Sequence, residues 1–180
     1  AGGFLTPVCA YHTKQGLSGK KLAQEVSKNF YGIDKDSHLA KLARMHIALL
    51  TSAHPQVICG DSIALTNGNG GILSHLPKGG VDVLLTNPPF GVRIVAANQE
   101  VLQSFALAKR WTPDKRTGRL APSNEMQKNV PPQVLFVERC LSLLKPGGRL
   151  GMVVPESLLS NKSYRHVVEY LTTHADLHAV

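Results

Sequence analysis

The tetrapeptide Asn87-Pro88-Pro89-Phe90 is the segment whose residue types are best suited to chemistry. It follows the apolar run 81–86, which predicts a buried strand ended by prolines. The side-chain oxygen of Asn87 and the carbonyl of Pro88 would form a rigid pair of hydrogen-bond acceptors, and Phe90 offers a flat face for stacking. Ligands of open α/β sheets bind beyond the carboxyl ends of the strands. We therefore expect this turn to hold a nucleobase amine.

Composition limits the class of protein. With 180 residues, of which 43% are hydrophobic, the chain is long enough for one globular domain with a sizeable core. Its 20 Lys and Arg outnumber its 12 Asp and Glu, and the formal net charge of +8 favours a polyanionic partner such as nucleic acid. No segment is long and apolar enough to cross a bilayer, and the first residues do not form a signal peptide. We expect a cytoplasmic protein.

The cysteines and histidines give no sign of a metal site. Cys9, Cys59 and Cys140 lie far apart and lack the close pairs of zinc sites and small disulfide frameworks. We expect all of them to be reduced, with Cys59 and Cys140 in the core. The histidines share no ligand spacing with an acid, so no metal is expected.

Helical and strand patterns alternate along the chain. Thr6 and Pro7 are suited to the start of the first helix, and a Gly- and Asn-rich loop covers 67–71. Strands that alternate with crossover helices predict an α/β fold with a mostly parallel, doubly wound sheet. The expected helices cover 6–13, 20–28, 37–50, 99–109, 134–144 and 163–173, and the expected strands cover 30–34, 56–60, 81–86 and 149–155, with another beginning at 177.

Two segments carry more specific expectations. Residues 110–133 contain several Pro and Gly, which predicts a long exposed loop. The helix 37–50 is expected to be capped by Asp36 or Ser37 and to bury one face. That face would comprise Leu39, Leu42, Ala43, His46, Ile47 and Leu50.

Several motifs follow one another in a characteristic order. The chain has a glycine turn at 2–5, an acid that ends a strand (Asp34), a Gly-Asp pair at 60–61, the Asn87 tetrapeptide and a Lys-Pro-Gly-Gly turn at 145–148. This order resembles that of the adenine-N6 DNA methyltransferases. The nearest likeness is to the methyltransferase (M) subunit of type I restriction systems, and it covers nearly the whole chain. The Asn-Pro-Pro-aromatic motif is specific for amino methylation, whereas the Lys-Pro-Gly-Gly turn is common to many methyltransferases.

The resemblance implies a Rossmann-like fold that binds S-adenosylmethionine. The backbone of the glycine turn would approach the cofactor, Asp34 would accept hydrogen bonds from both ribose hydroxyls, and Asp61 would accept one from the cofactor's adenine amine. Each acid is also of a type that caps a helix or shapes a turn, and that interpretation stays open. The cofactor-binding residues implied by the resemblance are Gly2, Gly3, Phe4, Asp34, Asp61, Ser62 and Asn87.

The resemblance also implies methyl transfer to the N6 amine of adenine by the catalytic residues Asn87, Pro88, Pro89 and Phe90. That amine is a poor nucleophile because its lone pair is delocalised into the ring. Acceptance of its protons by Asn87 and by the Pro88 carbonyl would localise the lone pair for in-line attack on the sulfonium methyl group, without a metal. Phe90 would stack on a base flipped out of the duplex. A proline-stiffened turn without chemistry is the alternative.

Double-stranded DNA is the partner that the resemblance implies, together with a specificity subunit and possible association with a restriction subunit. Basic residues in and beside the segment 110–133 would hold DNA phosphates near the site. A solvated insertion is the other interpretation of this segment. The candidate DNA-binding residues are Lys109, Arg110, Lys115, Arg116 and Arg119.

Both ends of the chain depart from the family pattern. The first strand of the fold, with its usual acid and first glycine, would precede Ala1, and the last strand would follow Val180. We therefore expect a partial catalytic domain over 1–180 that is truncated at both ends. By itself this fragment would bind cofactor weakly or not at all and would be inactive.

Two other kinds of function stay open. Methylases of RNA and of protein glutamine also use an Asn-Pro-Pro-aromatic motif, although they carry Tyr more often than Phe. The chain could also be a non-catalytic module for DNA binding or assembly.

Overall fold

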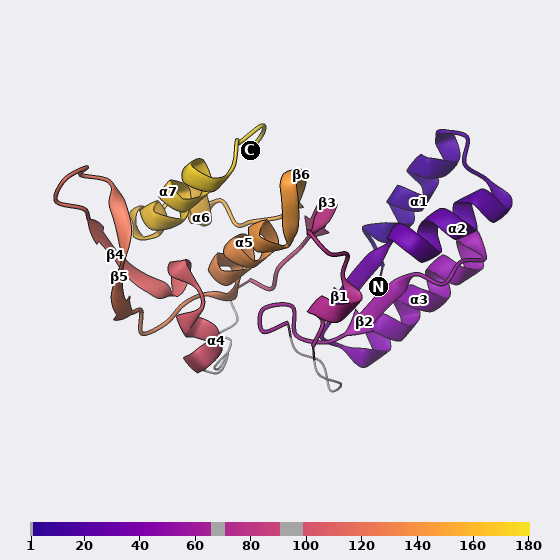
Figure 1. Ribbon diagram of the computed structural model, residues 1–180, viewed down its shortest axis with the longest axis horizontal. Helices are drawn as coiled ribbons and strands as arrows, with labels where there is room; N and C mark the ends of the chain where they lie inside the picture. The colour runs from indigo at the N-terminus through magenta and orange to yellow at the C-terminus, as the bar shows by residue number, and fades with distance from the viewer. Residues whose placement is uncertain (1, 66–70, 91–98) are drawn as a thin grey trace. The chain divides into compact units, whose positions relative to one another are not determined.

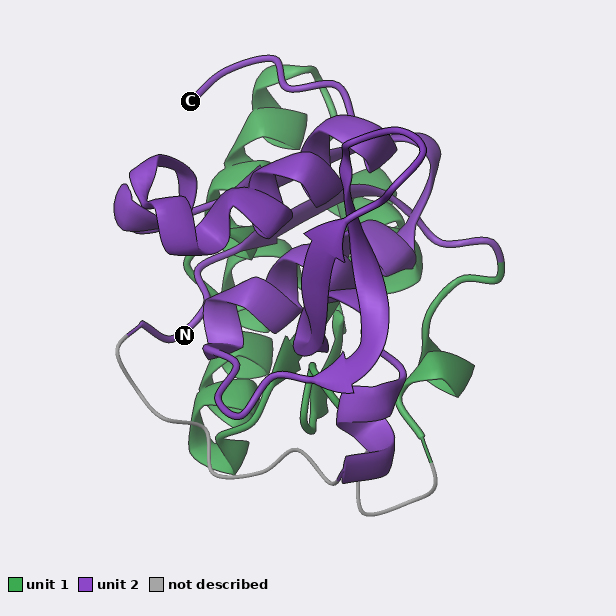
Figure 2. Cartoon of the chain, turned by 90° about the vertical axis from the view of Figure 1, so that its left-hand side faces the viewer, with its two compact units in different colours: residues 1–78 green, residues 79–180 purple. Residues whose placement is uncertain are grey.

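The computed structural model describes residues 2–65, 71–90 and 99–180. Within these ranges helices alternate with short strands that form parallel pairs and one antiparallel pair (Figure 1). The α/β class with parallel strands is therefore confirmed. The chain divides into two compact units, Ala1–Lys78 and Gly79–Val180, which we describe separately (Figure 2). The predicted loop at 67–71 lies outside the described residues, apart from Gly71.

The first unit contains a parallel strand pair and the helices that precede and connect its strands. Strand β1 (Tyr31–Asp34) pairs in register with β2 (Gln56–Cys59). The crossover between them is helix α3 (Ser37–Thr51), which starts at the predicted cap Asp36. The Asp36 carboxylate accepts two backbone N–H groups of the first turn. The other elements are α1 (Leu5–Lys14), α2 (Gly19–Asn29) and the short helix η1 (Leu73–His75).

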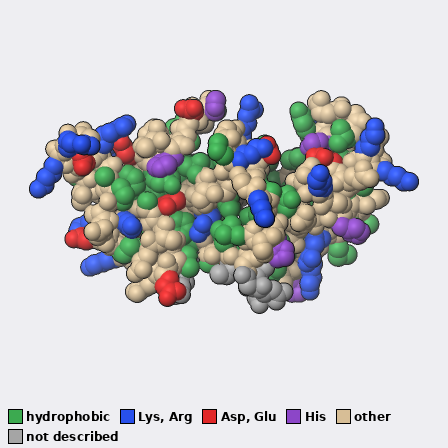
Figure 3. Space-filling view, in the orientation of Figure 1, with side chains coloured by type: hydrophobic (Ala, Val, Ile, Leu, Met, Phe, Trp, Pro, Cys, Tyr) green, Lys and Arg blue, Asp and Glu red, His purple; other side chains and the backbone are tan. Residues whose placement is uncertain are grey.

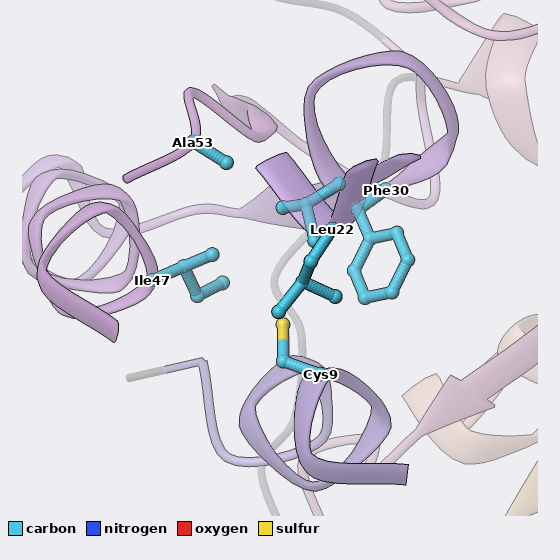
Figure 4. Close-up of a cluster of buried hydrophobic side chains, with 6 residues drawn as sticks. Cys9, Leu22, Phe30, Ile47 and Ala53 are labelled. Atoms are coloured by element: carbon cyan, nitrogen blue, oxygen red, sulfur yellow. The ribbon is translucent and has the colours of Figure 1, made fainter. Parts of the chain in front are cut away.

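A buried cluster joins the three long helices of the first unit (Figure 4). Cys9 of α1, Leu22 of α2 and Ile47 of α3 all belong to it. Phe30, which leads directly into β1, packs in the same cluster and is 6% exposed. Burial of side chains of this size stabilises a fold by about 1.5–3 kcal/mol each. The cluster therefore holds the helices and the start of β1 together.

Gly32 of β1 lets the start of α1 lie close to the strands. A Cβ atom on Gly32 would lie 3.2 Å from Cγ2 of Val57 and 3.4 Å from Cδ1 of Leu5. Leu5 is the first residue of α1 and directly follows the glycine turn. The absence of a side chain at Gly32 thus allows that turn to be held near β1 and β2.

The buried face of α3 differs from the predicted one. Ala40, Ala43, Ile47 and Thr51 are buried, and the two alanines pack against Val57 of β2. A Cβ atom on Gly2 would lie 3.4 Å from that of Ala43, and this close approach leaves no room for leucines on that side. The predicted face was therefore wrong at Leu39, Leu42, His46 and Leu50, which are exposed, and correct at Ala43 and Ile47.

The second unit contains a parallel strand pair, an antiparallel hairpin and the helices that pack on them. Strand β3 (Val81–Thr86) pairs with β6 (Leu144–Met152), and helix α5 (Pro132–Leu143) leads directly into β6. The predicted strand 149–155 thus begins earlier and ends earlier than expected. The remaining elements are α4 (Gln99–Gln103), η2 (Ala106–Ala108), α6 (Ser157–Ser160), η3 (Lys162–Tyr164) and α7 (Arg165–His174).

Close backbone contact explains why β6 includes the Lys-Pro-Gly-Gly turn. A Cβ atom on Gly80 would lie 2.7 Å from the backbone nitrogen of Lys145, and one on Gly148 would lie 2.9 Å from its carbonyl oxygen. Lys145 also forms an ion pair with Asp82. The turn is therefore packed against the start of β3, and the predicted end of the preceding helix is confirmed.

The segment 110–133 is not the long loop that its Pro and Gly content predicted. Strands β4 (Lys109–Pro113) and β5 (Leu120–Met126) form an antiparallel hairpin. At its tip, Oδ1 of Asp114 accepts two backbone N–H groups of the turn. The prediction failed because an exposed two-stranded ribbon tolerates polar residues and edge prolines that would disrupt a buried strand.

The base of this hairpin is anchored to the rest of the second unit. Trp111 packs against a buried cluster that includes Leu107, and its Nε1 donates a hydrogen bond to the carbonyl of Ala106 at 2.9 Å. The Gln127 amide donates to the carbonyls of Leu107 at 3.0 Å and Lys109 at 2.8 Å. The hairpin is thus anchored to the unit at its base through Trp111 and Gln127, whereas its tip is exposed.

His166 of α7 is half-buried among aromatic side chains, and its environment should make the stability of the second unit depend on pH. Its ring centroid lies 6.2 Å from that of Trp111 and 6.4 Å from that of Tyr164. Burial lowers the pKa of His166 below its usual 6.5, and a hydrogen bond to the Ser163 backbone opposes this only in part. Because the unfolded chain binds the proton at higher pH than the folded one, the free energy of unfolding should fall as pH drops below 6.5.

We expect His166→Gln to weaken this pH dependence in urea unfolding curves recorded between about pH 7.5 and pH 5. The replacement removes a group that the unfolded state protonates at a higher pH than the folded state does. His178→Gln, at an exposed position near the end of the chain, serves as the control and should leave the pH dependence unchanged. The same slope in His166→Gln and in the unsubstituted protein would contradict the expectation.

Other local predictions need correction. Cys59 is exposed at the end of β2, whereas Cys9 and Cys140 are buried, and all three thiols are free. Burial raises the pKa of Cys140 to about 12. The predicted helix 99–109 is divided into α4 and η2, and the residues from 177 onward form no strand. None of the described helices is long and apolar enough to cross a membrane.

Candidate functional site

The glycine turn before α1 leaves part of its backbone accessible. Gly2 has a φ of +70°, a conformation that favours glycine, and its carbonyl accepts hydrogen bonds from the backbone N–H and the hydroxyl of Thr6. Thr6 therefore closes the turn and does not cap α1, which begins at Leu5. A Cβ atom on Gly3 would meet no atom within 4 Å, and Phe4 is 42% exposed. A ligand can thus approach the backbone at Gly3.

Asp34 lies at the carboxyl end of β1 and is half-buried. Its Oδ1 accepts the backbone N–H of Asp36 at 2.9 Å. Its Oδ2 has no hydrogen bond to any described residue. The carboxylate therefore shapes its own turn, as the alternative interpretation expected, while its other oxygen has no described partner.

Asp61 follows β2 and uses both carboxylate oxygens. Oδ1 accepts the backbone N–H groups of Ile63 at 2.8 Å and Ala64 at 3.1 Å, in a turn that also contains the half-buried Ser62. Oδ2 lies 3.0 Å from Nζ of Lys35. Burial acts to raise the pKa of Asp61, but the hydrogen bonds from Ala64, Lys35 and Ile63 outweigh it and hold the pKa below its usual value. The group is therefore ionised at neutral pH.

The parallel register brings these acids to the same edge of the strand pair. Asp34 is paired with Cys59, two residues before Asp61. Lys35 bridges the two strand ends, because its side chain contacts Asp61 while its carbonyl lies 3.7 Å from Sγ of Cys59. We call Asp34, Lys35 and Asp61 the strand-end cluster. The sequence predicted its two acids, and the structure places them together.

The Asn87 tetrapeptide belongs to the second unit. Asn87 directly follows β3 and is exposed, Pro88 is buried, and Phe90 is 39% exposed. Neither the Asn87 amide nor the Pro88 carbonyl has a hydrogen-bond partner in the described part of the chain. Both acceptors are therefore available to a ligand, on a turn whose φ angles are restricted by Pro88 and Pro89.

The candidate DNA-binding residues differ in their surroundings on the hairpin. Arg110 and Arg119 form ion pairs with glutamates at 3.0 Å and 3.1 Å. Lys115 and Arg116 are exposed near the hairpin tip and form no ion pair with a described residue. Lys109 is half-buried at the base of the hairpin. Lys and Arg side chains gather over the β4–β5 hairpin at the left of the view in Figure 3.

A comparison with protein families accounts for most of the chain. The family described as Eco57I restriction-modification methylase matches residues 28–180. The chain belongs to this family. The matched range contains the strand-end cluster, the Asn87 tetrapeptide and the hairpin, whereas the glycine turn precedes it. The methylase family suggested by the motif order is thus confirmed.

Methylase subunits of type I restriction enzymes are similar to this member of the family. The identity over 162 residues is 27% to the StySPI methylase subunit of Salmonella potsdam and 26% to the EcoKI methylase subunit of Escherichia coli (strain K12). Each comparison covers 87% of this chain and 26% of the relative, so the chain spans about a quarter of the length of these curated relatives.

A solved structure shares the fold of this family member. A Listeria monocytogenes protein described as a class I S-adenosylmethionine-dependent methyltransferase superposes with a TM-score of 0.53 at 20% identity. The superposition covers 85% of this chain and 40% of that protein. The expected Rossmann-like methyltransferase fold is therefore confirmed.

Lys35 is the one member of the strand-end cluster that the sequence pattern did not single out. The sequence contained a signal for it, because a lysine between Asp34 and Asp36 at a strand end is placed to contact an acid. Which acid it contacts depends on the neighbouring strand, since Lys35 and Asp61 lie 26 residues apart in the chain.

Proposed function

We propose that the intact protein transfers a methyl group from S-adenosylmethionine to the N6 amine of adenine in double-stranded DNA. The observation that carries the proposal is the exposed Asn87 turn, whose acceptors have no hydrogen bond to a described residue, in a chain of a restriction-modification methylase family. Such a pair of acceptors matches the two protons of an exocyclic amine.

The tetrapeptide supplies the polarisation and the stacking surface. Asn87 and the Pro88 carbonyl accept the amine protons, which localises the nitrogen lone pair for attack. Phe90, at 39% exposure, stacks on a flipped base. Stacking contributes about 1–3 kcal/mol per base and offsets part of the few kcal/mol that flipping costs. The role of Pro88 and Pro89 is to keep the acceptors in a fixed relation.

We assign cofactor binding to the first unit. Oδ2 of Asp34 can accept a hydrogen bond from a ribose hydroxyl, and ionised Asp61 can accept one from the adenine amine. The backbone at Gly3 is accessible to the ligand. Phe4 and Ser62 flank these groups in the sequence, and Asn87 stays a candidate contact from the second unit. S-adenosylmethionine, when bound, supplies the sulfonium methyl group. Weak cofactor binding and inactivity of the 180 residues by themselves stay predictions.

Transfer of labelled methyl groups tests the proposed substrate. The intact protein is incubated with labelled S-adenosylmethionine in three parallel reactions, which contain double-stranded DNA, RNA or a glutamine-containing protein as the substrate. We expect label in N6-methyladenine of DNA. Label in RNA or in protein glutamine would favour the other amino methyltransferases. DNA binding without transfer to any substrate would favour a non-catalytic module.

We further propose that the protein works in the cytoplasm with a specificity subunit and a restriction subunit. The support is the similarity to chains that are themselves named as methylase subunits of type I restriction enzymes. The net charge of +8 agrees with DNA as a partner.

The hairpin tip should contribute phosphate contacts to DNA binding. For the double variant Lys115→Ala/Arg116→Ala, we expect lower DNA affinity at every sequence and a salt dependence whose slope is smaller by about 2, since each phosphate contact contributes about 0.9. Fluorescence anisotropy at several salt concentrations measures both effects. The control Arg110→Ala should change the slope less, because Arg110 is already paired with Glu125. An unchanged slope in the double variant would identify the hairpin as a solvated insertion.

A further inference from the structure

The strand-end cluster contains a cation next to the acid assigned to the cofactor's adenine. Nζ of Lys35 lies 3.0 Å from Oδ2 of Asp61, with side-chain exposures of 76% and 31%. Ion pairs this exposed contribute little to folding stability, because solvent screens them and long side chains lose freedom. The ion pair therefore adds little to the stability of the fold, and we consider whether it binds a ligand.

The pair presents a donor and an acceptor side by side. Oδ1 of Asp61 is occupied by the N–H groups of Ile63 and Ala64, which fix the plane of the carboxylate. Oδ2 receives Lys35 and has a second lone pair for another donor. The Lys35 ammonium has three protons, of which this contact uses one. One acceptor position on Oδ2 and two N–H donors on Nζ thus remain for a ligand, on atoms that lie 3.0 Å apart.

The backbone at Lys35 is held from both sides. The residue before it accepts a hydrogen bond from Asp36 at 2.9 Å, and Asp36 in turn caps α3. The Sγ of Cys59 in the neighbouring strand lies 3.7 Å from the Lys35 carbonyl. The aliphatic stem of Lys35 therefore starts from a defined position at the strand ends.

We propose that Lys35 determines the base specificity of the cofactor site by donating a hydrogen bond to a ring nitrogen of adenine while Asp61 accepts the neighbouring amine. The proposal rests on the assignment of Asp61 to the cofactor's adenine. Adenine presents an amine donor beside a ring-nitrogen acceptor, which is the complement of this pair. A purine with a 6-oxo group places a carbonyl oxygen opposite the Asp61 carboxylate and a ring N–H opposite the Lys35 ammonium, so that acceptor faces acceptor and donor faces donor. The Lys35–Asp61 pair thus selects an adenosyl group over an inosyl group.

Calorimetric titration of the intact protein with S-adenosylhomocysteine and with S-inosylhomocysteine tests this selection without relying on activity. We expect the unsubstituted protein to prefer the adenosyl ligand. Lys35→Met keeps the apolar stem and removes the donor, and it should reduce this preference about tenfold, the effect of a lost charged hydrogen bond. Lys35→Arg keeps a donor and should retain more of the preference. Lys41→Met, an exposed position on α3, serves as the matched control and should change neither affinity.

The outcomes separate the inference from the function on which it rests. If Asp61→Ala weakens adenosyl binding while Lys35→Met leaves the preference intact, Lys35 does not contact the base and the inference fails, although the cofactor assignment stands. An equal loss of affinity for both ligands in Lys35→Met would also overturn it, because a residue that only orients Asp61 or supports the fold would act in that way. If the unsubstituted protein binds neither ligand, the cofactor assignment itself is wrong.

Discussion

Asn87→Ala should lower the single-turnover rate of methyl transfer to DNA by about 100- to 1000-fold, the range found when one preorganised polar group at a reacting centre is removed. The physical reason is that the adenine amine loses the acceptor that localises its lone pair. Cofactor affinity should change far less than the rate, since the cofactor contacts assigned to the first unit remain. The measurement uses labelled S-adenosylmethionine with protein in excess over DNA.

Asn124→Ala provides the matched control for this variant. Asn124 is also an exposed asparagine of the second unit, in the middle of β5, and it lies outside the proposed catalytic residues. Its rate should equal that of the unsubstituted protein. If Asn87→Ala retains a rate within about threefold of the unsubstituted protein, the tetrapeptide is a stiff turn without chemistry.

Asp34→Asn should weaken binding of S-adenosylhomocysteine by about 10- to 100-fold, which is the effect of losing one charge-assisted hydrogen bond of about 1.5–3 kcal/mol. An asparagine oxygen can still accept the backbone N–H of Asp36, so the turn after β1 should persist. The oxygen that has no described partner is replaced by an amide nitrogen, which cannot accept a hydrogen bond from a ribose hydroxyl. Calorimetric titration of the intact protein measures the change.

Asp36→Asn provides the matched control, because it removes a neighbouring carboxylate that we do not assign to the cofactor site. Asp36 caps α3 through its Oδ1, and asparagine caps a helix about as well as aspartate. Its ligand affinity should therefore stay close to that of the unsubstituted protein. Equal affinities for Asp34→Asn and the unsubstituted protein would assign Asp34 to the turn alone.

Several elements could be predicted from local patterns because their boundaries depend on nearby residues. The strand 81–86 was predicted with its observed bounds, since an apolar run that meets two prolines has to end there. Its predicted burial was wrong, because Val83 and Leu85 are 58% and 41% exposed. Asp36 was predicted as a cap because a short acid before a helical pattern can accept the free N–H groups of the first turn.

Predictions that depended on distant contacts were less successful. The large leucines of α3 were expected in the core, but the glycine turn and β2 approach the helix so closely that alanines face them. The β4–β5 hairpin was missed because its strands are stabilised by pairing with each other and by anchoring through Trp111, not by a buried apolar run.

The sequence by itself determined where the polar groups suited to chemistry stand, at the ends of strands, because proline, glycine and acidic residues end a strand locally. It also determined the methylase family, since the order of those motifs survives at low identity. Only the tertiary structure decided that Lys35 contacts Asp61 and that the basic segment is a hairpin whose tip carries two cations without an ion pair to a described residue. The first feature is set by the pairing of β1 with β2, which brings together residues 26 positions apart. The second is set by the pairing of β4 with β5 and by their anchoring through Trp111. No local pattern encodes which side chains such pairing and anchoring bring into contact.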